Sequence, residues 1–234
     1  MVIHGGGEGA NSWRETVGQL AEDYSVYVPD LPGFGRSQPA AENQDMSDFV
    51  EFIDDFASNL GLQRFHLIGH SFGSGVAIGY ALKFPGKITK LVLVNSIYLG
   101  KGIAPWVRFL SRPFFSKAIG LPGYALFEVV KWLVSHLFSH MEFRNPLPRA
   151  RMELSRQMMT LKEQVTVLME RFSELLMPTL LVCGARDIIV PVSQAYTAAE
   201  LIPNCQLEVF ADGGHLIHQQ KSHEFSHLLR QFLD

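Results

Sequence analysis

A serine between glycines is the strongest chemical signal in this sequence. Residues 69–73 read Gly-His-Ser-Phe-Gly and match the pattern G-x-S-x-G. Residues 65–68 are typical of a short buried strand, and a helical pattern follows, so Ser71 falls on the turn between them. Such a turn is strained and needs small neighbours, and it lifts the hydroxyl above the sheet at a helix N-terminus. The pattern therefore predicts that Ser71 is a nucleophile.

A serine nucleophile needs a base, and the base needs an acid that orients it. His215 and Asp187 each follow a predicted strand, His215 in a glycine-rich turn. Because the carboxyl ends of parallel strands converge at one edge of a sheet, we expect Ser71, Asp187 and His215 to meet there. Asp212 is the alternative acid, but three residues before His215 it is better placed to shape the turn.

Three glycines follow His4, directly after the first predicted strand. Glycines let the backbone approach a substrate closely and point its N–H groups at a developing oxyanion. We expect the N–H groups of Gly6, Gly7 and Phe72 to form this oxyanion hole, and His4 to have a structural role in the loop. A glycine-rich loop can also bind phosphate, but no P-loop or dinucleotide-binding pattern follows this one.

A second motif, at residues 223–227, matches H-E-x-x-H, the pattern of a zinc-protease helix. It lies close to the last residue of the sequence, and no third ligand follows it. We expect His223, Glu224 and His227 to lie on the solvent-facing side of an amphipathic helix. The sequence therefore predicts no metal and no cofactor.

Short apolar runs alternate with amphipathic segments along the sequence. The predicted strands are 1–3, 24–28, 65–68, 90–94, 179–183 and 206–210, and the predicted helices are 13–22, 47–60, 73–84, 193–201 and 218–232. Several strands are continuous runs of Val, Ile and Leu, which is typical of a parallel sheet buried on both faces. The alternation predicts an α/β fold, with Ser47 capping the second helix and Gly61 ending it.

The strand at 24–28 is predicted to form one edge of this parallel sheet. Its apolar residues have no flanking charge to discourage pairing with another chain. The unpaired backbone groups of such an edge strand favour association with another chain, as a homodimer or an aggregate.

Composition narrows the function classes. The 234 residues are 47% hydrophobic and carry 20 basic and 23 acidic side chains, for a net charge of −3. A chain this apolar is not disordered, and a duplex-DNA binder would usually be basic. The two cysteines, Cys183 and Cys205, are too few for a disulfide framework. No signal peptide is evident, and the most apolar stretch, 121–138, is interrupted by charges, so we expect a cytoplasmic protein without a membrane span.

One long segment, 97–177, departs from the alternation of strands and helices. It shows only helical periodicity punctuated by prolines, and its 11 basic and 6 acidic side chains give it a net charge of +5. We interpret residues 97–177 as a helical cap and residues 1–96 with 178–234 as the core. Some of its aromatic side chains are expected to line a substrate pocket, namely Trp106, Phe109, Phe127 and Trp132.

These motifs together resemble the α/β-hydrolase superfamily over nearly the whole length. The resemblance rests on the loop at 4–7, the segment Asp-Leu-Pro-Gly-Phe-Gly-Arg-Ser at 30–37, the serine motif at 69–73, and the pair Asp187 and His215. Members usually begin with two strands before the one that leads into the glycine loop, whereas this sequence begins at that third strand. The resemblance thus implies a mainly parallel sheet of about six strands, without the first two family strands, and a helical cap.

Within the superfamily, residues 4–10 with Trp13 are similar to the start of the meta-cleavage-product hydrolases, which cut carbon–carbon bonds. Two positions differ: His70 stands where those enzymes usually carry Asn, and Leu216 where they usually carry Trp. The dehalogenase and epoxide-hydrolase branches use Asp as the nucleophile, and Ser71 argues against both.

These observations favour a serine hydrolase that cleaves an ester of a small apolar acyl or aryl substrate. A carbon–carbon bond hydrolase is the alternative within the same class. A noncatalytic or slow ligand-binding receptor is the alternative of another class. No nucleic-acid partner is expected.

Overall fold

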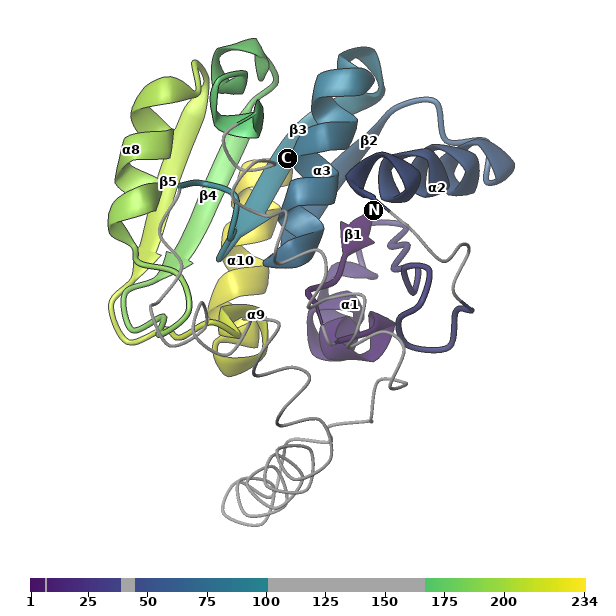
Figure 1. The fold of residues 1–234 in the computed structure, drawn as a ribbon. Coiled ribbons are helices and arrows are strands. Elements are labelled where there is room, and N and C mark those ends of the chain that lie inside the picture. Colours follow the sequence, from purple (N-terminus) through teal and green to yellow (C-terminus); the bar gives the residue numbers. More distant parts are fainter. Residues whose placement is uncertain (7, 39–44, 101–166) are drawn as a thin grey trace, which may run out of the picture.

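The computed structural model describes residues 1–6, 8–38, 45–100 and 167–234. In these residues five strands form one sheet in the order β1-β2-β3-β4-β5, and each neighbouring pair is parallel. The strands are β1 (Val2–Ile3), β2 (Phe65–His70), β3 (Ile88–Val94), β4 (Thr179–Gly184) and β5 (Cys205–Phe210). Figure 1 shows this sheet between two layers of helices. The predicted α/β class and the parallel arrangement are confirmed.

The helices alternate with the strands along the chain. The α-helices are α1 (Arg14–Leu20), α2 (Met46–Asn59), α3 (Phe72–Lys83), α8 (Ser193–Leu201), α9 (Ile217–Gln220) and α10 (Ser222–Leu233). Short 3-10 helices lie at η1 (Ala10–Trp13), η2 (Pro85–Lys87) and η3 (Phe172–Glu174). No helix among the described residues is long and apolar enough to cross a membrane.

Side chains that alternate along the strands form two separate cores. On β3, Leu91 and Leu93 join the cluster that includes side chains of α2, α3 and α8. Val92 and Val94 point the opposite way and join side chains of α1, α9 and α10. Burial on both faces explains why these strands are continuous apolar runs. The described ends of the predicted cap segment, 97–100 and 167–177, also contribute buried side chains to the first cluster.

The predicted strand at 24–28 is wrong, and the described sheet has five strands rather than about six. This segment runs beside β1, where the N–H of Val2 donates to the carbonyl oxygen of Tyr27 at 2.8 Å. Since β1 has only two residues, it offers few backbone groups with which a neighbour can form a ladder. The dimer predicted through this edge stays a prediction.

Two helix predictions also need correction. Asp45, not Ser47, caps α2: its carboxylate accepts from the N–H groups of Ser47 and Asp48, and the Asp48 side chain accepts from the N–H of Asp45. The helix predicted at 218–232 is two helices, because Lys221 leaves the helical conformation at φ −130° and ψ 41°. Gly61 does end α2, with a φ of +70° that suits glycine.

Candidate active site

Ser71 lies on the turn between β2 and α3, at the carboxyl edge of the sheet. Its backbone has φ 49° and ψ −112°, a conformation that non-glycine residues rarely adopt. The turn is held because the Ser71 N–H donates to the carbonyl oxygen of Val94 at 2.9 Å. The predicted strand–turn–helix context of Ser71 is therefore present.

Glycines on both sides of Ser71 permit this turn. A Cβ atom on Gly73 would lie 2.4 Å from the carbonyl oxygen of His4 and 2.6 Å from that of Ile3. A Cβ atom on Gly69 would lie 2.5 Å from the carbonyl oxygen of Gly73. These contacts are with backbone, which cannot turn aside as a side chain can. They also show that the first turn of α3 packs directly against the backbone of the N-terminal loop.

We expect Gly73→Ala to lower the free energy of unfolding by about 1–3 kcal/mol, because the new methyl group forces the loop and helix apart. Gly18→Ala is the matched control: nothing lies within 4 Å of its Cβ position in α1, so it should stabilise by about 0.5–1 kcal/mol. Urea unfolding of both variants measures the difference. Equal stability changes in the two variants would contradict the close packing at Gly73.

Ser71, His215 and Asp187 come together in one hydrogen-bonded chain. Nε2 of His215 lies 2.9 Å from Oγ of Ser71, and Nδ1 of His215 lies 2.7 Å from Oδ2 of Asp187. A carboxylate only accepts, so Nδ1 carries the hydrogen and Nε2 is left to accept from the serine hydroxyl. Asp187 is itself fixed, because its Oδ1 accepts from the N–H groups of Ile189 and Val190. The three residues therefore meet as the sequence predicts.

The alternative acid, Asp212, faces elsewhere. Its carboxylate lies 2.6 Å from Nζ of Lys221, and its side chain is 52% exposed. The hydrogen bond from Lys221 lowers the pKa of Asp212. Asp187, by contrast, is 2% exposed and bonds His215 directly. Of the two carboxylates, Asp187 is the one placed to orient His215.

Sequence reasoning missed Asn95, which ties the loops of His215 and Asp187 together. Its Nδ2 donates to the carbonyl oxygens of Gly214 and His215 at 3.0 and 2.8 Å, and its Oδ1 accepts from the N–H of Gly184 at 2.9 Å. Asn95 follows β3 with φ 43°, a conformation that Asn tolerates better than most residues. An Asn directly after a buried strand was the available signal, but its distant partners could not be read from the sequence.

His4 holds the N-terminal glycine loop from within the core. Its Nε2 accepts from the N–H of Leu31 at 3.0 Å, so its Nδ1 carries the hydrogen that reaches the carbonyl oxygen of Gly5 at 2.9 Å. Burial lowers the pKa of His4, which agrees with a neutral ring. These contacts support the structural role predicted for His4.

The predicted oxyanion donors are only partly described. Phe72 is the first residue of α3, and Gly6 lies in the loop that packs against it. Gly7 lies outside the described residues. The same holds for the predicted pocket residues Trp106, Phe109, Phe127 and Trp132.

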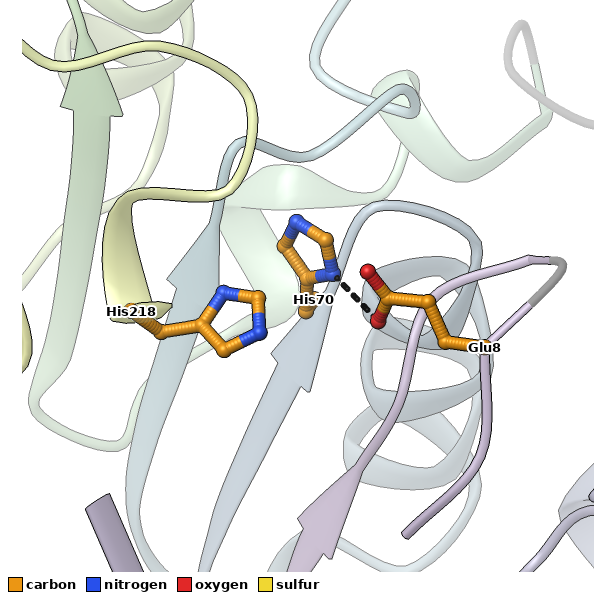
Figure 2. A group of neighbouring side chains, drawn as sticks. All are labelled: Glu8, His70 and His218. Carbon is orange, nitrogen blue, oxygen red and sulfur yellow. Dashed lines mark hydrogen bonds and ion pairs between the residues drawn. The ribbon is translucent and has the colours of Figure 1, made fainter. Parts of the chain in front are cut away.

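One group of described side chains brings three possible metal-ligand atoms within 4.8 Å of one another, namely Glu8, His70 and His218. Figure 2 shows His70 between the other two, with its Nδ1 directed at Glu8. Nδ1 of His70 and Oε2 of Glu8 lie 3.3 Å apart and form an ion pair. Because Glu8 and His70 already satisfy each other, we assign no metal to this group.

The H-E-x-x-H motif occupies the first turns of α10. His223, Glu224 and His227 are all exposed, whereas Phe225 and Ser226 between them are buried. The predicted solvent-facing position of the motif is confirmed.

We expect the double variant His223→Ala with His227→Ala to keep any turnover by the wild-type protein within about twofold, and chelators to leave the wild type unchanged. Initial rates with and without a chelator measure this. Inhibition that added zinc reverses would contradict it and assign the motif a metal.

Comparison with known proteins places this chain in a family. The sequence pattern of the alpha/beta hydrolase fold family matches residues 1–115 and 118–222. The chain belongs to that family. A 2-hydroxymuconate semialdehyde hydrolase of Pseudomonas putida is 28% identical over 246 residues, which cover 100% of this chain and 86% of that protein.

Solved structures share the α/β-hydrolase fold. A thermophilic esterase from Thermogutta terrifontis has a TM-score of 0.81 at 24% identity, covering 99% of this chain and 88% of the other. A meta-cleavage product hydrolase from Pseudomonas fluorescens has a TM-score of 0.74 at 24% identity, covering 99% and 89%. The resemblance predicted from the motifs is confirmed at the level of this α/β-hydrolase family.

Proposed function

We propose that this α/β-hydrolase is a serine hydrolase that cleaves an ester of a small apolar acyl or aryl substrate. The observation that carries the proposal is the hydrogen-bonded chain Ser71–His215–Asp187, built on a turn with the positive φ of Ser71. Acyl transfer needs a hydroxyl on a strained turn, an imidazole nitrogen close to it, here at 2.9 Å, and a buried carboxylate behind the imidazole.

In the proposed first step, Oγ of Ser71 bonds to the acyl carbon while its proton passes to Nε2 of His215. The negative charge on the substrate oxygen is bound by the backbone N–H groups of Gly6, Gly7 and Phe72. Asp187 keeps the hydrogen on Nδ1 of His215 and stabilises the imidazolium that forms. The proton on Nε2 then goes to the leaving alkoxide, which departs as the alcohol and leaves an acyl-enzyme on Ser71.

In the second step, His215 takes a proton from water as the water oxygen bonds to the acyl carbon. The tetrahedral intermediate collapses, the bond to Oγ of Ser71 breaks, and His215 returns the proton to that oxygen. The products are a carboxylic acid and the restored serine. The low exposure of His215 and Asp187 supports this assignment, because charge stabilisation is stronger where water is excluded.

A carbon–carbon bond hydrolase is the second candidate. The 28% identity to a 2-hydroxymuconate semialdehyde hydrolase over the whole of this chain favours it. His70, in place of the Asn that meta-cleavage-product hydrolases usually carry, and Leu216, in place of their Trp, favour the ester instead.

We expect a short p-nitrophenyl ester to be hydrolysed with a kcat/KM at least about tenfold above that of a coloured dienone acid. Both reactions are followed by absorbance with the same protein preparation. The reverse preference would overturn the ester assignment in favour of carbon–carbon cleavage. Binding of either compound without turnover would favour the ligand-binding alternative.

A further inference from the structure

His70 precedes the proposed nucleophile, and its ring is held from both sides. Nδ1 lies 3.3 Å from Oε2 of Glu8, as Figure 2 shows, and Nε2 lies 2.9 Å from the carbonyl oxygen of His215. The side chain is 1% exposed. A carboxylate and a backbone carbonyl can only accept hydrogen bonds, so both ring nitrogens must carry hydrogens. With Glu8 ionised, as its lowered pKa indicates, the contacts therefore require a buried imidazolium.

Each partner of His70 belongs to a different part of the site. Oε2 of Glu8 also accepts from the N–H of Gly5, at the start of the glycine loop. The carbonyl oxygen of His215 also accepts from Nδ2 of Asn95. His70 thus joins the glycine loop on one side to the backbone of the proposed base on the other.

We propose that His70 is a positioning residue: paired with Glu8, it acts as a charged clamp that holds the His215 backbone and the glycine loop in register around Ser71. This inference rests on the proposed function, in which His215 is the base. His70 hydrogen-bonds to the carbonyl oxygen of His215, whereas the ring nitrogens of His215 contact Asp187 and Ser71. The clamp therefore acts on the position of His215 and not on the reacting atoms.

The ionisation of the clamp agrees with its geometry. Burial alone would lower the pKa of His70, but the charge and hydrogen bond of Glu8 outweigh it, and the pKa is raised. Burial would raise the pKa of Glu8, but the charge of His70 holds it well below its ordinary value.

The other titratable groups that act on His70 come from three segments packed around it: His4, Asp187, His215 and His218. Burial, and then the charge of His70, keep the pKa of His218 well below its usual value, so that ring is neutral.

This clamp makes the site sensitive to alkaline pH. A group with a raised pKa keeps its charged contacts below that pKa and loses them as the pH rises through it. Neutral His70 has one N–H for two buried acceptors, so one of its two bonds must fail. We expect kcat to fall on the alkaline side as His70 loses its proton.

The pH dependence of kcat and KM in Glu8→Gln and His70→Asn tests the clamp. Glu8→Gln keeps an oxygen acceptor but removes the counter-ion, so the alkaline fall in kcat should move to lower pH. His70→Asn has no group to titrate, so kcat should lack this fall and lie on the order of 10- to 100-fold below wild type at neutral pH. KM should change much less than kcat in both variants.

Two exposed residues of α10 serve as matched controls, because Glu224→Gln and His223→Asn make the same chemical changes outside the site. Both should show the wild-type profile. An alkaline fall in kcat at the same pH in wild type and Glu8→Gln would overturn the clamp.

A second measurement does not depend on turnover. In ¹⁵N-histidine NMR of Ser71→Ala, with His70→Asn used for assignment, the His70 ring should be protonated on both nitrogens at neutral pH. Adding Glu8→Gln should convert it to a singly protonated ring. A singly protonated His70 in Ser71→Ala alone overturns the clamp. A wild type that turns over no ester overturns the proposed function instead, while the NMR result still decides the state of His70.

Discussion

Ser71→Ala is expected to lower kcat/KM for a p-nitrophenyl ester by about 10³-fold or more, because it removes Oγ, the proposed nucleophile. The loss should appear without unfolding, since alanine needs no more room than serine at the turn. Residual hydrolysis would come from the proposed oxyanion donors and from substrate binding.

Ser47→Ala is the control for this variant. Ser47 is an exposed serine in the first turn of α2, and its loss should leave the rate within about twofold. The steady-state kcat/KM values of Ser71→Ala and Ser47→Ala, each compared with wild type, measure the effect. A Ser71→Ala enzyme within tenfold of wild type would show that the hydrolysis proceeds through another group.

Asp187→Asn is expected to reduce kcat on the order of 10⁴-fold. The amide of Asn can donate a hydrogen to Nδ1 of His215, so the ring hydrogen then lies on Nε2. An Nε2 that carries a hydrogen can no longer accept the proton of Ser71. Because Asn has nearly the shape of Asp, thermal unfolding should show a folded protein. kcat of the purified variant measures the effect.

Asp212→Asn is the matched control. It removes a surface ion pair with Lys221 and should change kcat by less than about twofold. A large loss in Asp212→Asn with near-normal activity in Asp187→Asn would mean that the orienting acid has been assigned to the wrong carboxylate.

The sequence predicted the elements that depend on local signals. Some residues determine the conformation of their own stretch of backbone, so the sequence alone predicts their structural roles. Examples are the glycines around Ser71, the apolar runs in β2 and β4, and Gly61 after α2. The meeting of Ser71, Asp187 and His215 was predictable because parallel strands bring their carboxyl ends to one edge.

What the sequence left out depends on partners distant along the chain. The segment 24–28 has strand-like residues, but pairing depends on β1, which is only two residues long. Asn95 and the Glu8–His70 pair act through contacts with residues 62 to 145 positions away. Asp45 and Ser47 are both good caps, and only the reciprocal bond with Asp48 distinguishes them.

The most direct test of the proposed acyl-enzyme chemistry is to map the adduct of a fluorophosphonate probe on the wild-type protein by mass spectrometry of its peptides. The proposal predicts one adduct per chain, on Ser71, and none in Ser71→Ala or in wild type blocked by an ester substrate. An adduct on any other residue, or labelling that persists in Ser71→Ala, would contradict it.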